Sequence, residues 1–237
     1  MRPTNLFQRR GIRHKIFAIA SVGAVLGIGA TATLAAWNDN EWVVGGTAAG
    51  GAGIGTSTFD VWQNREQAPT NILATWDDKE TELAAGGLTF STGTLALTPG
   101  DSTYAPVAIQ TKTGSIAGSL ILQAPVKSTA VAYTDPSSVL WGALQYSVQV
   151  TETAKVCTAG TWATFGTAIA NNVDFDAALT PTSQTVAANR GNIQYYCFKV
   201  TLPAEPAGVT DLNTLQGLTS APAWRFAATS TTTSTTT

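Results

Sequence analysis

The stretch LQYSVQVT, residues 144–151, alternates apolar and polar side chains along its whole length. Its four apolar members, from Leu144 to Val150, fall on one face of an extended chain, and the polar ones fall on the other. Alternation with a period of two is typical of a β-strand that lies with one face on a protein core. This stretch therefore predicts a half-buried strand.

The same pattern recurs in YYCFKVTL, residues 195–202, where Tyr196 and Phe198 share one face and Cys197 lies on the other. Six further runs rich in β-branched and aromatic residues are separated by Gly, Pro, Asn and Asp, at 56–62, 71–76, 92–97, 102–111, 115–123 and 223–229. Long helical periodicity is absent, and only 135–141 and 210–217 suggest short capped helical turns. About eight strands in this arrangement predict an all-β fold, a jelly-roll-like β-sandwich.

The N-terminal segment has the three-part layout of a signal peptide. Five basic residues precede an uncharged Gly/Ala-rich run over 16–34, and small residues follow it. Cleavage between Ala35 and Ala36 leaves Ala35 and Thr33 at the −1 and −3 positions, and cleavage after Ala32 also fits. The alternative is a retained membrane helix, but three glycines make the run weakly hydrophobic. We therefore expect a secreted or cell-surface protein that meets a membrane only through its uncleaved signal peptide.

The composition of the mature chain excludes several functions. Residues 1–35 contain five of the 13 basic and none of the 15 acidic side chains, so removing them leaves a net charge near −7. Nucleic acid and anionic membranes need clustered cations, so neither is an expected partner. The only histidine, His14, is removed with the leader.

The two cysteines, Cys157 and Cys197, predict one disulfide, because an exported chain meets an oxidising environment. Two free buried thiols are the alternative. The bridge would pin the stretch 158–192, which reads as loop-rich, against the strand that contains Cys197. In the loop-entropy model such a closure stabilises the fold by about 3–4 kcal/mol.

The chain is expected to have four parts: a signal peptide at 1–35, an N-terminal arm and Gly/Ala linker at 36–55, a β-sandwich domain at 56–228, and a disordered Ser/Thr tail at 229–237. O-glycosylation of the tail is an open alternative. The arm is a short segment with four bulky apolar side chains, Trp37, Trp42, Val43 and Val44.

No catalytic, metal-binding or cofactor-binding residue is predicted. The mature chain has no HExxH motif and no histidine, and its acidic clusters at 39–41, 77–80 and 174–176 do not match the EF-hand spacing. A Ser or Thr nucleophile would need a lysine or carboxylate as its base, and neither GxSxG nor SxxK occurs. We therefore expect a protein that is not an enzyme and needs no cofactor.

Four stretches resemble the TasA/camelysin family: TLAAWND at 33–39, STFDV at 57–61, LALTPGDSTYAPVAIQTKTGSIAG at 95–118, and LQGLTSAPAWRF at 215–226. The first is similar to the site at which a dedicated, SipW-type signal peptidase cuts the family's exported precursors. Residues 125–205 match weakly, and the leader and the YCF strand are most similar to actinobacterial members. The cysteine pair is a departure from the best-known fibre-forming member.

The resemblance implies an extracellular jelly-roll protein that builds biofilm-matrix fibres or lies on the cell surface. In fibre-forming relatives the mature N-terminus of one subunit completes a sheet in the next. The apolar arm on a Gly/Ala tether agrees with that mechanism, with Trp37, Trp42, Val43 and Val44 as candidates for self-association into a homopolymer. The alternatives are a monomeric secreted module that binds glycans or cell-wall polymer and, third, a camelysin-like peptidase.

Overall fold

The structure, a computed structural model, describes residues 56–68, 76–91, 93 and 96–231. The chain divides into residues 1–55 and 56–237, and every described residue belongs to the second unit. Its elements are β1 (Val61–Asn64), η1 (Glu82–Ala84), β2 (Ser102–Thr111), β3 (Gly118–Leu122), β4 (Val126–Lys127), α2 (Val139–Ala143), β5 (Gln145–Thr151), α3 (Ala159–Trp162), β6 (Thr167–Asp174), β7 (Ser183–Val186), β8 (Gln194–Thr201), η3 (Leu212–Leu215), β9 (Pro222–Ala223) and β10 (Phe226–Ser230). Among these residues no helix is both long and apolar enough to span a membrane.

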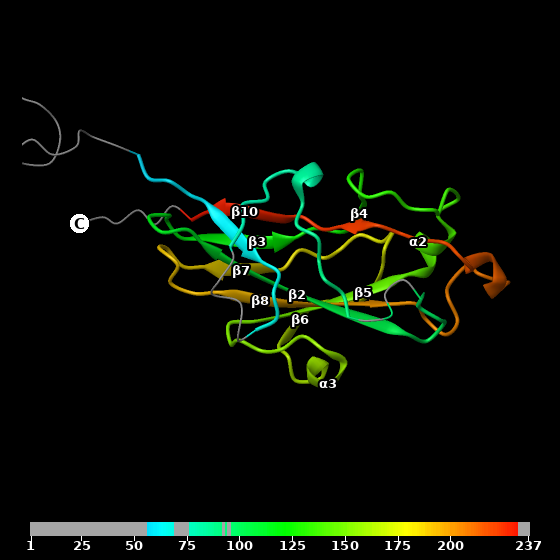
Figure 1. Ribbon diagram of the computed structural model, residues 1–237. Coiled ribbons are helices and arrows are strands. Elements are labelled where there is room, and N and C mark those ends of the chain that lie inside the picture. The colour runs from blue at the N-terminus through cyan, green and yellow to red at the C-terminus, as the bar shows by residue number, and fades with distance from the viewer. Residues whose placement is uncertain (1–55, 69–75, 92, 94–95, 232–237) are drawn as a thin grey trace, which may run out of the picture. The chain divides into compact units, whose positions relative to one another are not determined.

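The strands form two main antiparallel sheets and a short pair. The large sheet has the order β1-β2-β8-β5-β6, the small sheet has the order β10-β3-β7, and β4 pairs with β9. The small sheet lies on one side of the large one, and α3 lies on the other side (Figure 1). The expected all-β sandwich is therefore confirmed.

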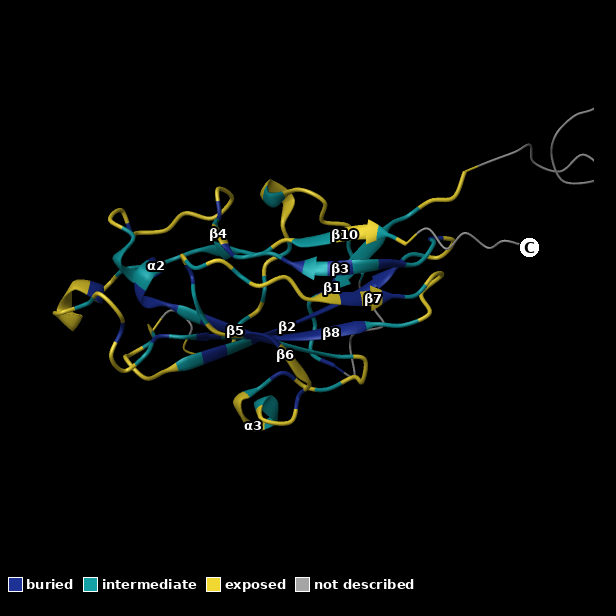
Figure 2. Cartoon of the chain, turned by 180° about the vertical axis from the view of Figure 1, so that it is seen from behind, coloured by how far each residue is buried: buried dark blue, intermediate teal, exposed yellow. Residues whose placement is uncertain are grey.

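Alternation of side chains explains how the sheets share a core. Tyr196 and Phe198 of β8 face the small sheet. The ring centre of Phe226, in β10, lies 4.6 Å from that of Tyr196, and the ring centre of Trp224, between β9 and β10, lies 5.0 Å from that of Phe198. Ring pairs at such distances stabilise a fold by about 0.5–1.5 kcal/mol beyond the burial of their area. In Figure 2 the buried residues concentrate along β2 and β8, in the middle of the fold.

A second apolar cluster covers the outer face of the large sheet. The disulfide between Cys157 and Cys197, predicted from the sequence, is present and buried. It holds the segment around α3 over Ala108 and Tyr195, with Phe165 packed beneath it. The Gln67 side chain adds a double hydrogen bond to the Cys157 backbone, with both N–O distances at 2.9 Å. The outer face is therefore a packed layer rather than a solvent-facing one.

Three local features differ from the sequence-based expectations. The stretch 158–192, predicted to be loop-rich, contains α3, β6 and β7, whose polar outward faces hide the strand pattern. In the run 92–97 none of the described residues is in a strand, and residues 71–75 lie outside the described part. β10 extends to Ser230, two residues into the predicted tail, because pairing with β3 continues to Gly118. The helical turns near 135–141 and 210–217 are present as α2 and η3.

Candidate assembly edge

Every second residue of β10 directs its backbone N–H and C=O groups toward the neighbouring strand β3. The Gln123 N–H donates to the Arg225 carbonyl at 2.8 Å, and the Thr231 N–H donates to the Ala117 carbonyl at 3.0 Å. These two bonds belong to the same antiparallel register as β10 itself. Since hydrogen-bonded pairs alternate along an antiparallel ladder, the odd-numbered residues from Arg225 to Thr231 direct their backbone groups toward β3.

The even-numbered residues of β10 therefore direct their backbone groups away from the sheet. These are Phe226, Ala228 and Ser230, and β10 is the last strand of its sheet. Within the described residues, no backbone hydrogen bond joins them to another segment on that side. No charged residue or proline interrupts the strand. An edge of this kind is a template for pairing with another strand.

The opposite edge of the small sheet, at β7, is covered by side-chain amides. The Thr185 carbonyl accepts hydrogen bonds from Gln194 Nε2 at 2.7 Å and from Asn192 Nδ2 at 3.1 Å. Gln194 is buried and also donates to Glu152 Oε1 at 3.0 Å. An incoming strand would have to displace these amides, so β7 is a poor template.

Both edges of the large sheet are also protected. At β1, the backbones of Gln63 and Asp77 exchange two hydrogen bonds of 2.9 and 3.0 Å. At β6, the register against β5 shifts twice, and Asn172 adopts a left-handed conformation with φ at 47°. Bulges of this kind bend an edge and interrupt its pairing pattern. Among the edges of the two main sheets in the described residues, β10 is thus the one without cover.

The chain enters the domain at the end of this open edge. The Ile116 N–H donates to the Thr58 carbonyl at 2.9 Å, in the turn that also receives the end of β10. Lys112 also holds this first segment of the domain. Its Nζ lies 2.6 Å from Oδ2 of Asp60 and pairs with Asp78 as well. Hydrogen bonds to Asp60 and then Asp78 raise the pKa of Lys112, so its positive charge is held at neutral pH.

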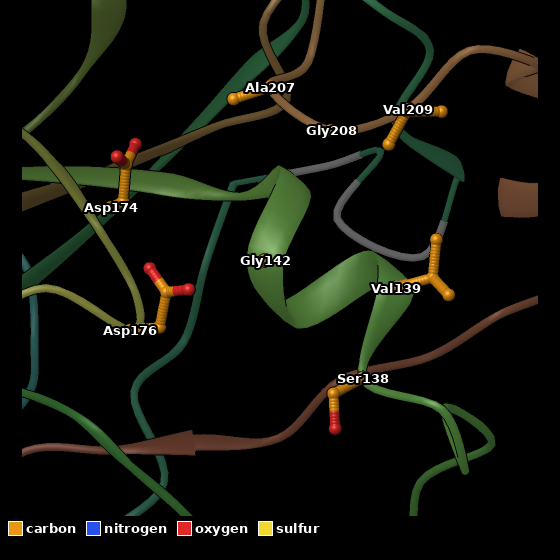
Figure 3. A pocket seen from close by; sticks show the side chains of 8 residues that line it. All are labelled: Ser138, Val139, Gly142, Asp174, Asp176, Ala207, Gly208 and Val209. Carbon is orange, nitrogen blue, oxygen red and sulfur yellow. The ribbon is translucent and has the colours of Figure 1, made fainter.

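A separate cavity of about 390 Å³ lies beside α2. It is lined by Ser138, Val139, Gly142, Asp174, Asp176, Ala207, Gly208 and Val209. Figure 3 shows the carboxylates of Asp174 and Asp176 on one side of the helix and the Ser138 side chain near its start. Asp174 accepts a hydrogen bond from Gln145 Nε2 at 2.8 Å, which gives it a structural partner.

Ser138 is the one lining residue with a candidate base beside it, because Lys127 Nζ donates to its Oγ. Ser138 also has a left-handed backbone, with φ at 59°. Lys127 Nζ also lies 5.5 Å from the centre of the Trp141 ring, at the distance of a cation–π contact. The Ser138 hydroxyl and the Trp141 ring together hold the Lys127 side chain beside α2.

In the acidic cluster at 77–80, the two aspartates form ion pairs. Asp77 lies 2.6 Å from Arg65 Nη2, and Asp78 pairs with Lys112. In the described part of the chain no three metal-ligating side chains come together. The arrangement of Asp77 and Asp78 is that of surface ion pairs.

The other predicted site residues fall outside the described residues. These are the cleavage pair Ala35 and Ala36 and the self-association candidates Trp37, Trp42, Val43 and Val44. The open edge at β10 was not predicted from the sequence. Its signal was present in FAATS, residues 226–230, which lacks the charges and prolines that usually protect an edge.

Comparison with models of protein families finds none that matches this chain, and no match is found among curated proteins.

Proposed function

We propose that this chain is a secreted structural protein, a subunit of a biofilm-matrix or cell-surface fibre that assembles by N-terminal strand donation. The observation that carries this proposal is the contrast among the edges of the two main sheets, of which β10 alone lacks cover in the described residues. Segment 36–44 supplies a matching donor, because it is short and apolar and is joined to the domain by a Gly/Ala tract. The resemblance of four stretches to the TasA/camelysin family supports the same function.

Two further observations support an extracellular location. The buried disulfide is typical of proteins that mature in an oxidising compartment. The first 35 residues have the layout of a signal peptide. We therefore propose export, with signal peptidase cutting between Ala35 and Ala36, and N-terminal sequencing of the secreted protein checks this position.

The proposal is tested with purified mature protein that begins at Ala36. Alternate side chains of a donor strand face the acceptor, so Trp42 and Val44 share one face and Val43 points away. A chain beginning at Thr56 and a Trp42→Asp variant should stay folded by circular dichroism and form no filaments in negative-stain microscopy. Val43→Asp is the matched control and should still form them.

Two results would contradict strand donation. One is normal filaments from the chain that begins at Thr56. The other is an intact mature chain that stays monomeric at high concentration.

A second candidate is a secreted module that binds glycans, and one observation favours it. The half-buried rings of Trp62 and Trp76 stack at 5.7 Å, and the guanidinium of Arg190 lies 5.3 Å from the centre of Trp62. Aromatic surfaces in secreted sandwiches can stack on sugar rings. Retention of the chain that begins at Thr56 on isolated cell-wall polymer, abolished by Trp76→Ala, would favour this function.

A further inference from the structure

Tyr104, Trp162 and Lys199 form a cluster of two aromatic rings and a cation on the outer face of the large sheet. The ring centre of Tyr104, in β2, lies 5.9 Å from that of Trp162, the last residue of α3. Lys199 of β8 is the register partner of Tyr104, and its Nζ lies 5.8 Å from the centre of the Trp162 ring. All three residues are only partly buried, so a ligand in solution can reach this group, which we call the α3 cluster.

The group formed by Trp62, Trp76 and Arg190, which we call the β1 cluster, has the same parts as the α3 cluster. Each cluster has two aromatic rings in contact, with centres 5.7 and 5.9 Å apart, and one cation near a tryptophan ring, at 5.3 and 5.8 Å. Rings from both clusters pack against the layer that contains the disulfide. The outer face therefore presents two aromatic surfaces, each with its own positive charge.

The cations of the two clusters are not paired with acidic side chains. The ion pairs among the described residues involve Arg65 and Lys112, and none of them includes Arg190 or Lys199. The chain as a whole has more acidic than basic side chains, so an acidic partner within the chain was not scarce. Both cations are thus available to a carboxylate from another molecule, which a guanidinium or ammonium binds with charge-assisted hydrogen bonds.

The β1 cluster also contains buried N–H groups that lack an acceptor. Gln110, the register partner of Trp62, is 2 % exposed. Its Nε2 and the indole N–H groups of Trp62 and Trp76 have no hydrogen-bond partner within the part of the chain that the structure describes. Buried donors normally have a partner. Carboxylate and hydroxyl oxygens accept hydrogen bonds from such groups, so this end of the face favours an oxygen-rich ligand.

We propose that the outer face of the large sheet binds a polysaccharide that carries carboxylate groups, with the β1 cluster and the α3 cluster as its two subsites. Sugar rings stack on the tryptophans, and Arg190 and Lys199 each bind a carboxylate of the polymer. This inference rests on the second candidate function, glycan binding, and names the class of ligand and a second contact point for it.

The separation of the two clusters is suited to a polymer. The six residues from Tyr104 to Gln110 on β2 span roughly 20 Å, because an extended strand rises 3.2–3.4 Å per residue. A single sugar residue is much shorter than this, so it can occupy one cluster only. A chain of several sugars can engage both clusters, and two linked contacts bind more tightly than either contact alone.

Single-stranded nucleic acid is another anionic polymer that stacks on aromatic rings. Its affinity depends on many clustered cations that track the backbone, whereas these two clusters supply one cation each. The small number of cations and the wide spacing between them favour a polysaccharide.

Binding of the mature chain to soluble polygalacturonate, measured by isothermal titration calorimetry, tests the inference. The chain should bind this polymer, and it should bind about tenfold more weakly after the carboxylates of the polymer are reduced to alcohols. Arg190→Gln and Lys199→Gln should each weaken binding about tenfold, because each removes one charge-assisted hydrogen bond. Lys199→Arg keeps the charge and should restore binding.

Lys127→Gln is the matched control. It removes the same charge from a similar contact with Trp141, which belongs to the core between the sheets, so binding should be unchanged. Melting temperatures show whether each variant is folded. If Lys199→Gln is unstable, the comparison of Lys199→Arg with Trp162→Phe, which keeps an aromatic ring, repeats the test at the α3 cluster. Normal binding by Lys199→Arg and weaker binding by Trp162→Phe would then support it, and equal binding would contradict it.

The outcomes separate this inference from glycan binding in general. Equal affinity for polygalacturonate and its reduced form would overturn the anionic ligand and leave glycan binding standing. Loss of binding with Arg190→Gln but not with Lys199→Gln would overturn the α3 cluster as a subsite. No binding to polygalacturonate, with retention on cell-wall polymer that depends on Trp76, would overturn the inference alone. No binding to either would overturn both, and tighter binding to single-stranded DNA would assign the face to nucleic acid instead.

Discussion

The two edges of the small sheet differ in whether side chains form hydrogen bonds with their outward backbone groups. At β7 the outward carbonyl of Thr185 receives two side-chain amides, from Asn192 and Gln194. At β10 the backbone groups of Phe226 and Ala228 receive no such partner among the described residues. Both edges belong to one sheet and are only a few residues long, so length alone does not account for the difference. Cover at an edge is a local property that particular side chains supply.

The outer face of the large sheet extends this contrast. There the disulfide, α3 and Phe165 form a second packed layer on the side away from the small sheet (Figure 1). Two parts of the domain, the β7 edge and the layer around α3, are covered, and together they are called the closed region. The β10 edge has no such cover in the described residues and is called the open region. If the contrast is functional, changes in the closed region should alter stability and leave filaments intact, whereas changes at β10 should do the reverse.

The largest effect in the closed region is expected from removal of the disulfide. Replacing Cys157 and Cys197 together with Ala frees a loop with a sequence separation of 40 residues. In the loop-entropy model this lowers the free energy of unfolding by about 3–4 kcal/mol. Urea denaturation of the variant and the unmodified domain measures the difference. A loss under about 1 kcal/mol would show that packing of Phe165 and Tyr195 holds the segment without the bond.

The next effect is expected at Gln67, whose amide substitutes for a strand partner at the buried Cys157 backbone. Gln67→Ala leaves an N–H and a carbonyl unpaired, and we expect a loss of about 2 kcal/mol in the same denaturation experiment. Gln63→Ala is the matched control, because the hydrogen bonds that join Gln63 to Asp77 are made by its backbone, which the substitution keeps. Equal losses from both substitutions would contradict the assigned role.

These contacts show where the sequence was informative and where it was not. Alternation located the strands that contain Tyr146 and Phe198, and the cysteine count predicted the disulfide, because period and redox chemistry are local signals. Alternation did not locate β6 or β7, because their outward positions are polar and the residues that cover them are distant in the sequence. The open edge at β10 depends on which strands pair, and pairing joins residues far apart in sequence.

A third, smaller effect is expected at the β7 edge. Asn192→Ala combined with Gln194→Leu uncovers the Thr185 carbonyl and should make β7 resemble β10. In a chain that begins at Thr56, which has no donor arm, the double variant should lose about 1–2 kcal/mol and form small oligomers in sedimentation velocity. The unsubstituted Thr56 chain is the control. If the double variant stays monomeric, amide cover is not what separates the two edges.

The smallest effect is expected from Tyr146, a fully buried tyrosine in the core between the sheets. Burial raises the pKa of Tyr146 to about 12, so the folded state favours the neutral phenol. A raised pKa contributes stability that is fully present below the unfolded pKa near 10, and this stability is lost as pH rises toward 12. At pH 11 Tyr146 should therefore weaken the fold by about 1 kcal/mol relative to pH 8.

Tyr146→Phe isolates this contribution. The Tyr146 hydroxyl has no hydrogen-bond partner in the described residues, so the variant should match the unmodified domain at pH 8 and be more stable at pH 11. Denaturation at both pH values measures the difference. Burial also raises the pKa of Tyr196, so part of the alkaline loss should persist in the variant. Because Tyr146 lies in the core and not at the β10 edge, filaments of the mature variant at pH 8 should be normal, and their loss would show that the core and the open edge are coupled.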